Sequence, residues 1–243
     1  MKFDHIIMNP PYCRNLHLKI LNEALKHSDD VVNLSPIRWL QDPLAEYKKN
    51  SDWKKFEDIR KKIKSLEVIP SSISNALFSI NTGDLGIYSI NCHSDSTTHT
   101  RVVHPIILKV LNKLNQSVMD VSSEEGYRGA YTGIFGIINS HYGDVTKLVS
   151  NDYELFCKQR YTNVNKVIFF NTEAERLSMF NYLNSKLMRM YAKLVRVNQR
   201  VPWQFVPNMP TYTHEWTDEM LYEYFELTPE EITLIENEFK DEV

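Results

Sequence analysis

The stretch Lys2-Phe3-Asp4-His5-Ile6-Ile7-Met8-Asn9-Pro10-Pro11-Tyr12 decides the fold that we expect for this chain. Its apolar residues predict a short buried strand that ends at Met8. The strand cannot continue, because the two prolines lack the backbone N–H donors that a central strand needs. Residues Asn9 to Tyr12 are therefore expected to form a stiff turn at the end of this strand.

The residues that follow predict a strand, helix, strand unit. Apolar residues recur at helical spacing from Leu16 to Leu25, and a second apolar run, Val31 to Leu34, stops at Ser35-Pro36. This alternation favours a parallel sheet of the α/β class. In such sheets functional groups lie beyond the carboxyl ends of the strands, where Asn9–Tyr12 and Ser35–Trp39 both fall.

Residues 40–92 are expected to complete the α/β unit. We predict a helix over Phe56–Leu66, strands over Leu66–Ile69 and Asn75–Ile80, and a hairpin partner over Asp84–Ile90. The polar stretch Asn91–Thr100 offers almost nothing to bury, which predicts a linker between two domains.

We expect the two domains to cover residues 1–95 and 101–243, with a smaller α+β fold in the second. In that second domain Thr172 and Thr228 are each followed three residues later by Glu, the spacing of a capping box at a helix start. The predicted elements are a helix over Val103–Leu114, a strand over Lys166–Phe170, one long helix over Thr172–Val197 and a tail helix from Thr228.

The Asn9–Tyr12 turn suits the binding of a planar exocyclic amine. The Asn9 side-chain carbonyl and the Pro10 backbone carbonyl can accept from its two N–H bonds, which raises the nucleophilicity of the nitrogen. Pro10 and Pro11 hold these acceptors in place before reaction, and Tyr12 offers a ring face on which a flipped base can stack. The tetrapeptide alone also fits a strand-ending turn with an incidental tyrosine.

The segment from Lys2 to Tyr12 resembles the fourth conserved motif of the amino-methyltransferases. Trp203–Pro207, Trp216–Tyr222 and Leu227–Ile232 are similar to the C-terminal end of the Eco57I-like restriction-modification methylases of bacteria and phages. The resemblance runs from end to end and implies a site-specific, adenine-specific DNA-methyltransferase.

By this resemblance Asn9, Pro10 and Tyr12 bind the target adenine in an NPPY motif, and Phe78 packs on the base as a second aromatic. A phenylalanine between strands also fits a core position. The resemblance implies a partial Rossmann-like methyltransferase sheet, then an α+β target-recognition domain, with S-adenosyl-L-methionine as donor. The motif would equally suit a protein glutamine amide or a guanine amine, and the large region after Thr100 favours DNA.

The chain departs from the family pattern where the donor should bind. The family places a strand and a glycine-rich loop before the NPPY strand, whereas only Met1–Asp4 precede it here and the first glycine is Gly83. Three expectations follow: a split enzyme that is inactive without a SAM-binding partner subunit, a truncated remnant, or a non-catalytic DNA-binding or subunit-interaction module.

Two sequence features are candidates for DNA contact. Gly126–Tyr142 interleaves glycines with aromatic residues and includes Arg128 and Tyr131, which fits either a stacking surface or a glycine-rich hairpin with core aromatics. A basic stripe at helical spacing fits either phosphate contact or a solvated helix face. The stripe consists of Arg189, Lys193, Arg196 and Arg200.

Composition bounds these hypotheses. With 243 residues, 42% of them hydrophobic, the chain can bury a core, and its net charge of -3 leaves DNA binding to local basic surfaces. The three cysteines are far apart and the histidines show no metal spacing, so we expect neither a disulfide framework nor a metal site. No apolar run predicts export or a membrane span, and a cytoplasmic location is expected by default.

Overall fold

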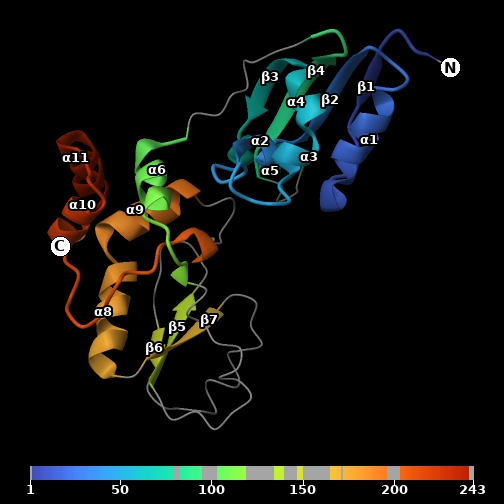
Figure 1. The fold of residues 1–243 in the computed structure, drawn as a ribbon. Coiled ribbons are helices and arrows are strands. Elements are labelled where there is room, and N and C mark those ends of the chain that lie inside the picture. The colour runs from blue at the N-terminus through green and yellow to red at the C-terminus, as the bar shows by residue number, and fades with distance from the viewer. Residues whose placement is uncertain are drawn as a thin grey trace. The chain divides into compact units, whose positions relative to one another are not determined.

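A computed structural model of the chain describes residues 2–78, 83–94, 103–118, 134–139, 147–149, 165–170, 172–195 and 203–240 (Figure 1). Backbone proximity divides the chain into two compact units, Met1–Val102 (unit 1) and Val103–Val243 (unit 2). The division falls next to the predicted linker. Because unit 2 spans more of the chain than unit 1, the expectation of a smaller second domain is wrong.

Unit 1 contains a four-stranded mixed sheet in the order β1-β2-β4-β3. Its strands are β1 (Ile6–Met8), β2 (Asp30–Pro36), β3 (Ile63–Ile69) and β4 (Leu85–Asn91). β1 pairs with β2 in parallel, as predicted, whereas β4 is antiparallel to both β2 and β3. Since β4 opposes both neighbours, β1, β2 and β3 all run in the same direction. Mixed α/β content is thus observed. β4 corresponds to the predicted hairpin strand Asp84–Ile90 and is antiparallel, but it pairs with β2 and β3.

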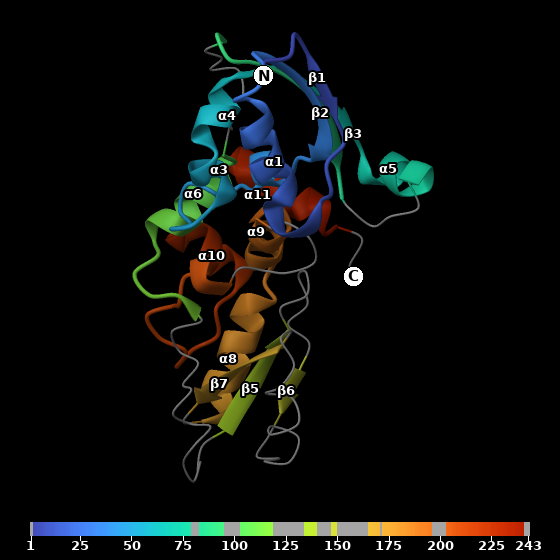
Figure 2. The ribbon, with the colours of Figure 1, turned by 90° about the vertical axis from the view of Figure 1, so that its right-hand side faces the viewer.

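One face of this sheet carries the core of unit 1. Figure 2 shows α1, α3 and α4 on this side and α5 on the other. The covering helices are α1 (Leu16–Ala24), α2 (Arg38–Gln41), α3 (Asp52–Lys55) and α4 (Glu57–Lys61). The core that they close includes Leu18, Leu21, Val31, Trp39, Trp53, Ile59, Ile63, Tyr88 and Ile90, all under 10% exposed.

The opposite face of the sheet carries exposed apolar residues beside the polar Ser89 and Glu67. Ile7 on β1 is 84% exposed, and it lies opposite Val32 on β2, which is 37% exposed. Ile87 on β4 is also 37% exposed. Parallel strands are usually covered on both faces, so exposed apolar residues on β1 and β2 are uncommon.

Two predictions between residues 56 and 80 are wrong. Ile63 begins a strand instead of continuing a helix, because pairing with Ile90 places its side chain fully in the core. The predicted strand Asn75–Ile80 falls largely on a helix, α5 (Ser71–Phe78). β4 pairs with β2 and β3.

The helix α5 is held by residues that follow it. The Ser71 backbone N–H donates to Asp84 Oδ1 at 2.8 Å, which caps the first turn, and the Ser74 hydroxyl donates to the Gly83 carbonyl at 3.0 Å. Capping of this kind supplies a helix N-terminus with its missing acceptors. No local pattern in the sequence of α5 predicts these hydrogen-bond partners.

Unit 2 combines a small antiparallel sheet with a group of helices. The strands lie in the order β6-β5-β7, and the capping boxes predicted at Thr172 and Thr228 are both confirmed. Its elements are α6 (Pro105–Asn112), β5 (Ile134–Asn139), β6 (Lys147–Val149), β7 (Asn165–Phe170), α8 (Glu173–Leu183), α9 (Lys186–Val195), η4 (Trp203–Phe205), α10 (Asp218–Tyr224) and α11 (Pro229–Glu238). The predicted strand Lys166–Phe170 is confirmed as β7.

The long helix predicted over Thr172–Val197 is two helices, α8 and α9. α9 has its own cap, because the Met188 backbone N–H donates to Ser185 Oγ at 3.3 Å. The Lys186 backbone N–H also donates to Asp218 Oδ1 at 2.9 Å, which supplies a second acceptor from a distant segment. These acceptors satisfy the free N–H groups that a new helix start exposes, so the chain can change direction between Leu183 and Lys186.

Candidate functional site at the carboxyl edge of the sheet

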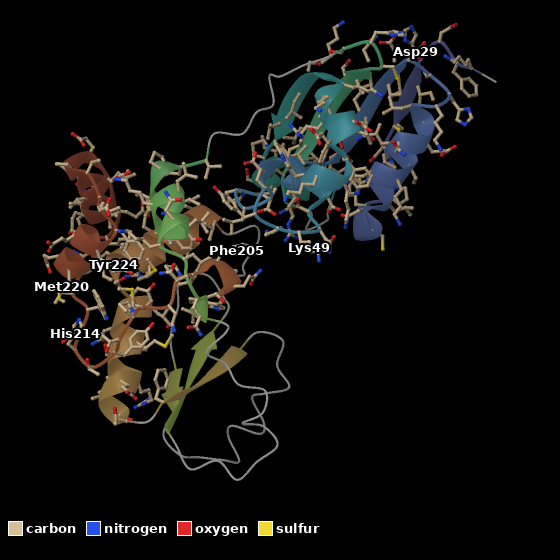
Figure 3. All side chains as sticks on the ribbon, viewed as in Figure 1. Asp29, Lys49, Phe205, His214, Met220 and Tyr224 are labelled. Atoms are coloured by element: carbon tan, nitrogen blue, oxygen red, sulfur yellow. The ribbon has the colours of Figure 1, made fainter. Side chains whose placement is uncertain are left out.

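The carboxyl ends of the parallel strands β1, β2 and β3 lie along one border of the sheet, which we call the carboxyl edge. Three connecting segments begin there. β1 leads into Asn9–Tyr12, β2 leads into α2, and β3 leads into α5. Figure 3 labels Asp29, just before β2, and Lys49, after α2, at opposite ends of unit 1. Open α/β sheets place their ligands beyond the carboxyl ends of the strands, which makes this edge the candidate site.

The Asn9–Tyr12 loop presents one amide oxygen at this edge. Asn9 and Pro11 are exposed, Pro10 is buried and Tyr12 is half-buried, so the loop is anchored by the first proline. The Tyr12 hydroxyl donates to Asn9 Oδ1 at 2.6 Å across the two prolines. An amide oxygen has two lone pairs, so the bond from Tyr12 occupies only one of the two acceptor positions of the exposed Asn9.

Tyr12 is held on its other side by His17. The two rings meet edge to face, with 6.3 Å between their centroids and 83° between their planes. Burial raises the pKa of the Tyr12 hydroxyl, so the hydroxyl remains a donor at neutral pH. The single-turn 3-10 helix η1 (Cys13–Asn15) brings His17 under the loop at the start of α1.

A buried polar cluster lies on the core face of β2 and β4. Asn33 lies opposite Tyr88 on β4 and opposite Met8 on β1. Met8 is the last residue of β1, so Asn33 lies beside the point where the loop begins. The Asn33 Nδ2 donates to Ser35 Oγ at 2.8 Å, and Ser35 is hydrogen-bonded to the Tyr88 hydroxyl. Burial raises the pKa of Tyr88, and the bond to Ser35 offsets part of that rise. All three side chains are fully buried.

Several polar atoms near the loop have no hydrogen-bond partner among the described residues. They are His17 Nδ1, Asn33 Oδ1 and Trp39 Nε1, in side chains that are 5%, 0% and 6% exposed. An unpaired buried polar atom costs free energy, so such atoms are rare unless function retains them.

Charged groups surround the same end of the core. Burial lowers the pKa of His17, and the nearby Asp52 carboxylate offsets part of that change. Burial also lowers the pKa of Arg38 at the start of α2, with Asp42 and Asp52 opposing it. His17 is therefore favoured in its neutral form. The edge thus offers neutral hydrogen-bonding groups near the loop and a guanidinium beside two carboxylates.

The predicted second aromatic, Phe78, lies on α5 and is 40% exposed. It is a surface residue of a helix, which does not fit the alternative of a core phenylalanine between strands. β1 and β3 lie at opposite edges of the sheet, three strand spacings or roughly 14 Å apart. Strand order therefore does not bring Phe78 next to Tyr12, and their joint contact with one base stays a prediction.

The predicted DNA-contacting residues are only partly described. Arg128, Tyr131, Arg196 and Arg200 lie outside the described residues. On α9 the Arg189 guanidinium lies 4.5 Å from the centroid of the Phe239 ring, and Lys193 is paired with Glu238. These two members of the stripe contact the α11 end of unit 2, so their contacts lend no support to phosphate binding.

Sequence reasoning missed the support beneath the loop. His17, Asn33 and Tyr88 are not among the expected site residues, whereas Ser35 lies in the segment Ser35–Trp39 that is expected beyond the end of a strand. His17 contacts the Tyr12 ring, and Asn33, Ser35 and Tyr88 form the buried polar cluster. One signal was present: Asn33 interrupts the apolar run Val31–Leu34, and a polar residue inside a buried strand needs a partner. Tyr88 gave no comparable signal, because tyrosine is common in strands.

Some features are absent from the part of the chain that the structure describes. No helix there combines the length and apolar character needed to cross a bilayer, and no group of three His, Cys, Asp or Glu side chains can hold a metal ion. None of the turns that follow β1, β2 and β3 contains a glycine. No protein-family profile, curated protein or solved structure matches this chain.

Proposed function

We propose that the Asn9–Tyr12 loop binds the exocyclic amino group of an adenine flipped out of DNA, for methylation at N6. The observation behind this proposal is an exposed amide acceptor, Asn9 Oδ1, on a proline-fixed loop just beyond a parallel strand. Tyr12 lies within hydrogen-bonding distance of that oxygen and carries the only aromatic ring of the loop. An aromatic ring and fixed acceptors are the groups by which enzymes hold a flipped base.

The chemistry assigned to this chain is binding and orientation of the amine. Asn9 Oδ1 and the Pro10 carbonyl accept from the two N–H bonds, which draws the nitrogen toward a tetrahedral geometry and leaves its lone pair directed away from the loop. The two prolines restrict the loop before the base arrives, so little ordering is needed on binding. Asn9 and Pro10 are thus the proposed catalytic residues, and Tyr12 the stacking residue.

The described residues do not fit S-adenosyl-L-methionine. The donor's anionic carboxylate and ribose are usually bound by a glycine-rich turn after a parallel strand, and the turns after β1, β2 and β3 have no glycine. We therefore assign donor binding to a further polypeptide region or partner subunit. β1, which contains the exposed Ile7, is an edge strand of its sheet. Additional strands of a Rossmann-like sheet would pair with this edge strand.

The exposed apolar face also supports a second candidate, a non-catalytic subunit-interaction module derived from such an enzyme. Ile7, Val32 and Ile87 form a surface suited to protein contact without any chemistry. The two candidates differ in what they require of Asn9. Amine binding needs its oxygen, whereas an interaction module does not.

The test compares two DNA duplexes that differ by one amino group. Each duplex carries one test base opposite an abasic site, which lowers the free-energy cost of flipping that base. The test base is adenine in one duplex and unsubstituted purine, which lacks the amino group, in the other. We expect the chain to bind the adenine duplex several-fold more tightly, and Asn9→Ala to lose this preference. Fluorescence anisotropy at low salt measures both affinities, and Asn22→Ala, an exposed asparagine on α1, is the matched control.

Titration calorimetry with S-adenosyl-L-methionine tests the assignment of the donor site. The isolated chain is expected to show no micromolar binding. Micromolar binding would disprove the need for a further donor-binding region. Equal affinity for the two duplexes in wild type and Asn9→Ala would disprove amine binding and favour the interaction module.

A further inference from the structure

We propose that the acidic C-terminal helix α11 covers a basic, phosphate-binding surface on α6 and α9, and that binding of the DNA backbone there requires α11 to yield these cations. The inference goes beyond the Asn9–Tyr12 loop and rests on the proposed function only in taking DNA as the ligand. We call the covered surface the α6–α9 surface. It consists of Lys109, Lys113, Lys186, Arg189 and Lys193.

The charges of the chain are divided unevenly along its length. Residues 203–243 contain eleven Asp and Glu residues, and Lys240 is their only Lys or Arg. Because the net charge of the whole chain is -3, the residues before Trp203 carry a net positive charge. Such asymmetry is typical of a chain that combines a nucleic-acid-binding part with an acidic segment.

The cations of the α6–α9 surface lie in two rows on neighbouring helices. On α6, Lys109 and Lys113 are four residues apart, which places them on one side of the helix. On α9, Lys186, Arg189 and Lys193 follow one another at spacings of three and four, so they also share one side. α9 packs against α6, α10 and α11, and Figure 1 shows these helices together in unit 2.

The two lysines of α6 pair with the start of α11 and with the turn before it. Lys109 Nζ lies 2.6 Å from Glu231 Oε2, and Lys113 Nζ lies 2.7 Å from Glu226 Oε1. Lys109 Nζ also donates to the Glu226 carbonyl at 2.6 Å. Acidic and backbone oxygens of the C-terminal segment thus occupy positions that phosphate oxygens would take.

The cations of α9 meet the second half of α11. Lys186 pairs with Glu236, and Lys193 pairs with Glu238. Arg189, between the two lysines in sequence, contacts the aromatic ring of the residue directly after α11. One helix therefore covers cations of both α6 and α9.

Burial of apolar side chains contributes little to holding α11 in place. Within Pro229–Glu238, which the structure describes in full, Ile235 is the only buried residue, and Leu234 is 42% exposed. The ion pairs are themselves partly exposed, and exposed ion pairs contribute little to stability. A dense row of DNA phosphates can therefore compete with α11 for these lysines.

Two triple variants with the same change in net charge test this proposal. The first neutralises glutamates that pair with the α6–α9 surface and keeps an oxygen acceptor at each position: Glu231→Gln, Glu236→Gln and Glu238→Gln. The matched control neutralises exposed glutamates for which the described residues supply no ion pair: Glu215→Gln, Glu223→Gln and Glu230→Gln. Circular dichroism melting establishes that both remain folded. If the first triple variant loses its helical signal, Glu238→Gln and Glu223→Gln replace the two triple variants.

Fluorescence anisotropy with a fully paired duplex measures backbone binding without base flipping. We expect the first variant to bind this duplex about ten-fold more tightly than wild type at low salt, and the control to gain less than about two-fold. The slope of log affinity against log salt is expected to steepen by about two to three, because each released lysine adds about one phosphate contact.

Removal of the lysines assigns the gain to its source. Lys109→Gln, Lys186→Gln and Lys193→Gln are introduced together into wild type and into the first triple variant. The loss of affinity is expected to be larger in the triple variant, where it cancels the gain, than in wild type, where the lysines are already paired. A gain that persists without the lysines would disprove covering by α11.

The two proposals fail in different ways. Equal affinities of the first variant and the control for the paired duplex would show that only net charge matters, which disproves covering by α11. That result leaves open a preference of the loop for adenine over purine in the duplexes described above. Conversely, a loop that ignores the amino group disproves amine binding, while a gain specific to the first variant still supports the α6–α9 surface.

Discussion

Two buried tyrosines of unit 2, Tyr182 and Tyr191, satisfy their hydroxyls differently from the buried Tyr88 of unit 1. In unit 2, Tyr182 donates to the Pro207 carbonyl at 2.5 Å and Tyr191 to the Phe205 carbonyl at 2.7 Å, so both side chains fix the segment that contains η4. Phe205 is labelled in Figure 3. In unit 1, Tyr88 is hydrogen-bonded to Ser35 in a cluster that leaves Asn33 Oδ1 unpaired.

This difference separates tyrosines that bond a backbone carbonyl from a tyrosine that belongs to a side-chain cluster. A tyrosine bonded to a backbone carbonyl leaves neither partner unsatisfied, which favours the folded state. Unpaired buried atoms carry an energetic cost and occur in both units: His17 Nδ1 and Asn33 Oδ1 in unit 1, and Arg176 Nη1 and Trp203 Nε1 in unit 2. The following predictions test whether the two units differ in this way.

The largest expected effect concerns the independence of the two units. Leu21 on α1 and Leu187 on α9 are both fully buried, so truncation to alanine leaves a cavity in each case. Each variant is expected to lower the free energy of unfolding of its own unit by about 2–5 kcal/mol. Hydrogen exchange in increasing urea resolves the units, and equal loss of protection in both by either variant would contradict their independence.

A smaller effect on stability is expected from removing the hydroxyl of Tyr182, which bonds a backbone carbonyl, or of Tyr88, which bonds a side chain. Tyr182→Phe leaves the Pro207 carbonyl without its donor and is expected to destabilise unit 2 by about 1–3 kcal/mol. Tyr88→Phe is expected to destabilise unit 1 by less than about 1 kcal/mol, because its cluster is already incompletely paired. Urea unfolding of both variants measures the difference. Equal losses would remove the contrast between the units.

The smallest expected effect is a pH dependence confined to unit 1. Burial lowers the pKa of His17 below its ordinary value of 6.5, so the unfolded chain binds its proton at a higher pH than the folded chain. The stability contribution of His17 is therefore complete above 6.5 and is lost as the pH falls through the lowered pKa.

His17→Leu is expected to reduce the loss of stability that unit 1 shows as the pH falls. The pH dependence of the stability of unit 2 is expected to stay unchanged. Urea unfolding at a series of pH values, monitored by hydrogen exchange, measures the slope in each unit. An unchanged slope in unit 1 would show that His17 is not the group responsible.

Prediction from sequence succeeded where the signal was local. The strand that ends at Met8, the helix from Leu16, and the capping boxes at Thr172 and Thr228 each depend on residues within a few positions of one another. Proline geometry and helix capping act over that same short range, so these elements could be recognised directly.

Prediction failed where distant residues decided the outcome. Ser71 begins a helix because Asp84 caps it, and α9 starts anew at Lys186 because Asp218 does the same. The contacts of Arg189 with Phe239 and of Lys193 with Glu238 are equally distant in sequence. A charged stripe read along one helix contains no information about the helix that packs on it.

For the candidate site, the sequence by itself determined the chemical groups: an amide, two prolines and a ring at the end of a strand. Only the tertiary structure decided how they meet, with Tyr12 bonded to Asn9 and resting on the buried His17. The physical reason is that backbone restriction by proline is a property of neighbouring residues. The environment of a side chain depends instead on strand pairing and helix packing, which join residues far apart along the chain.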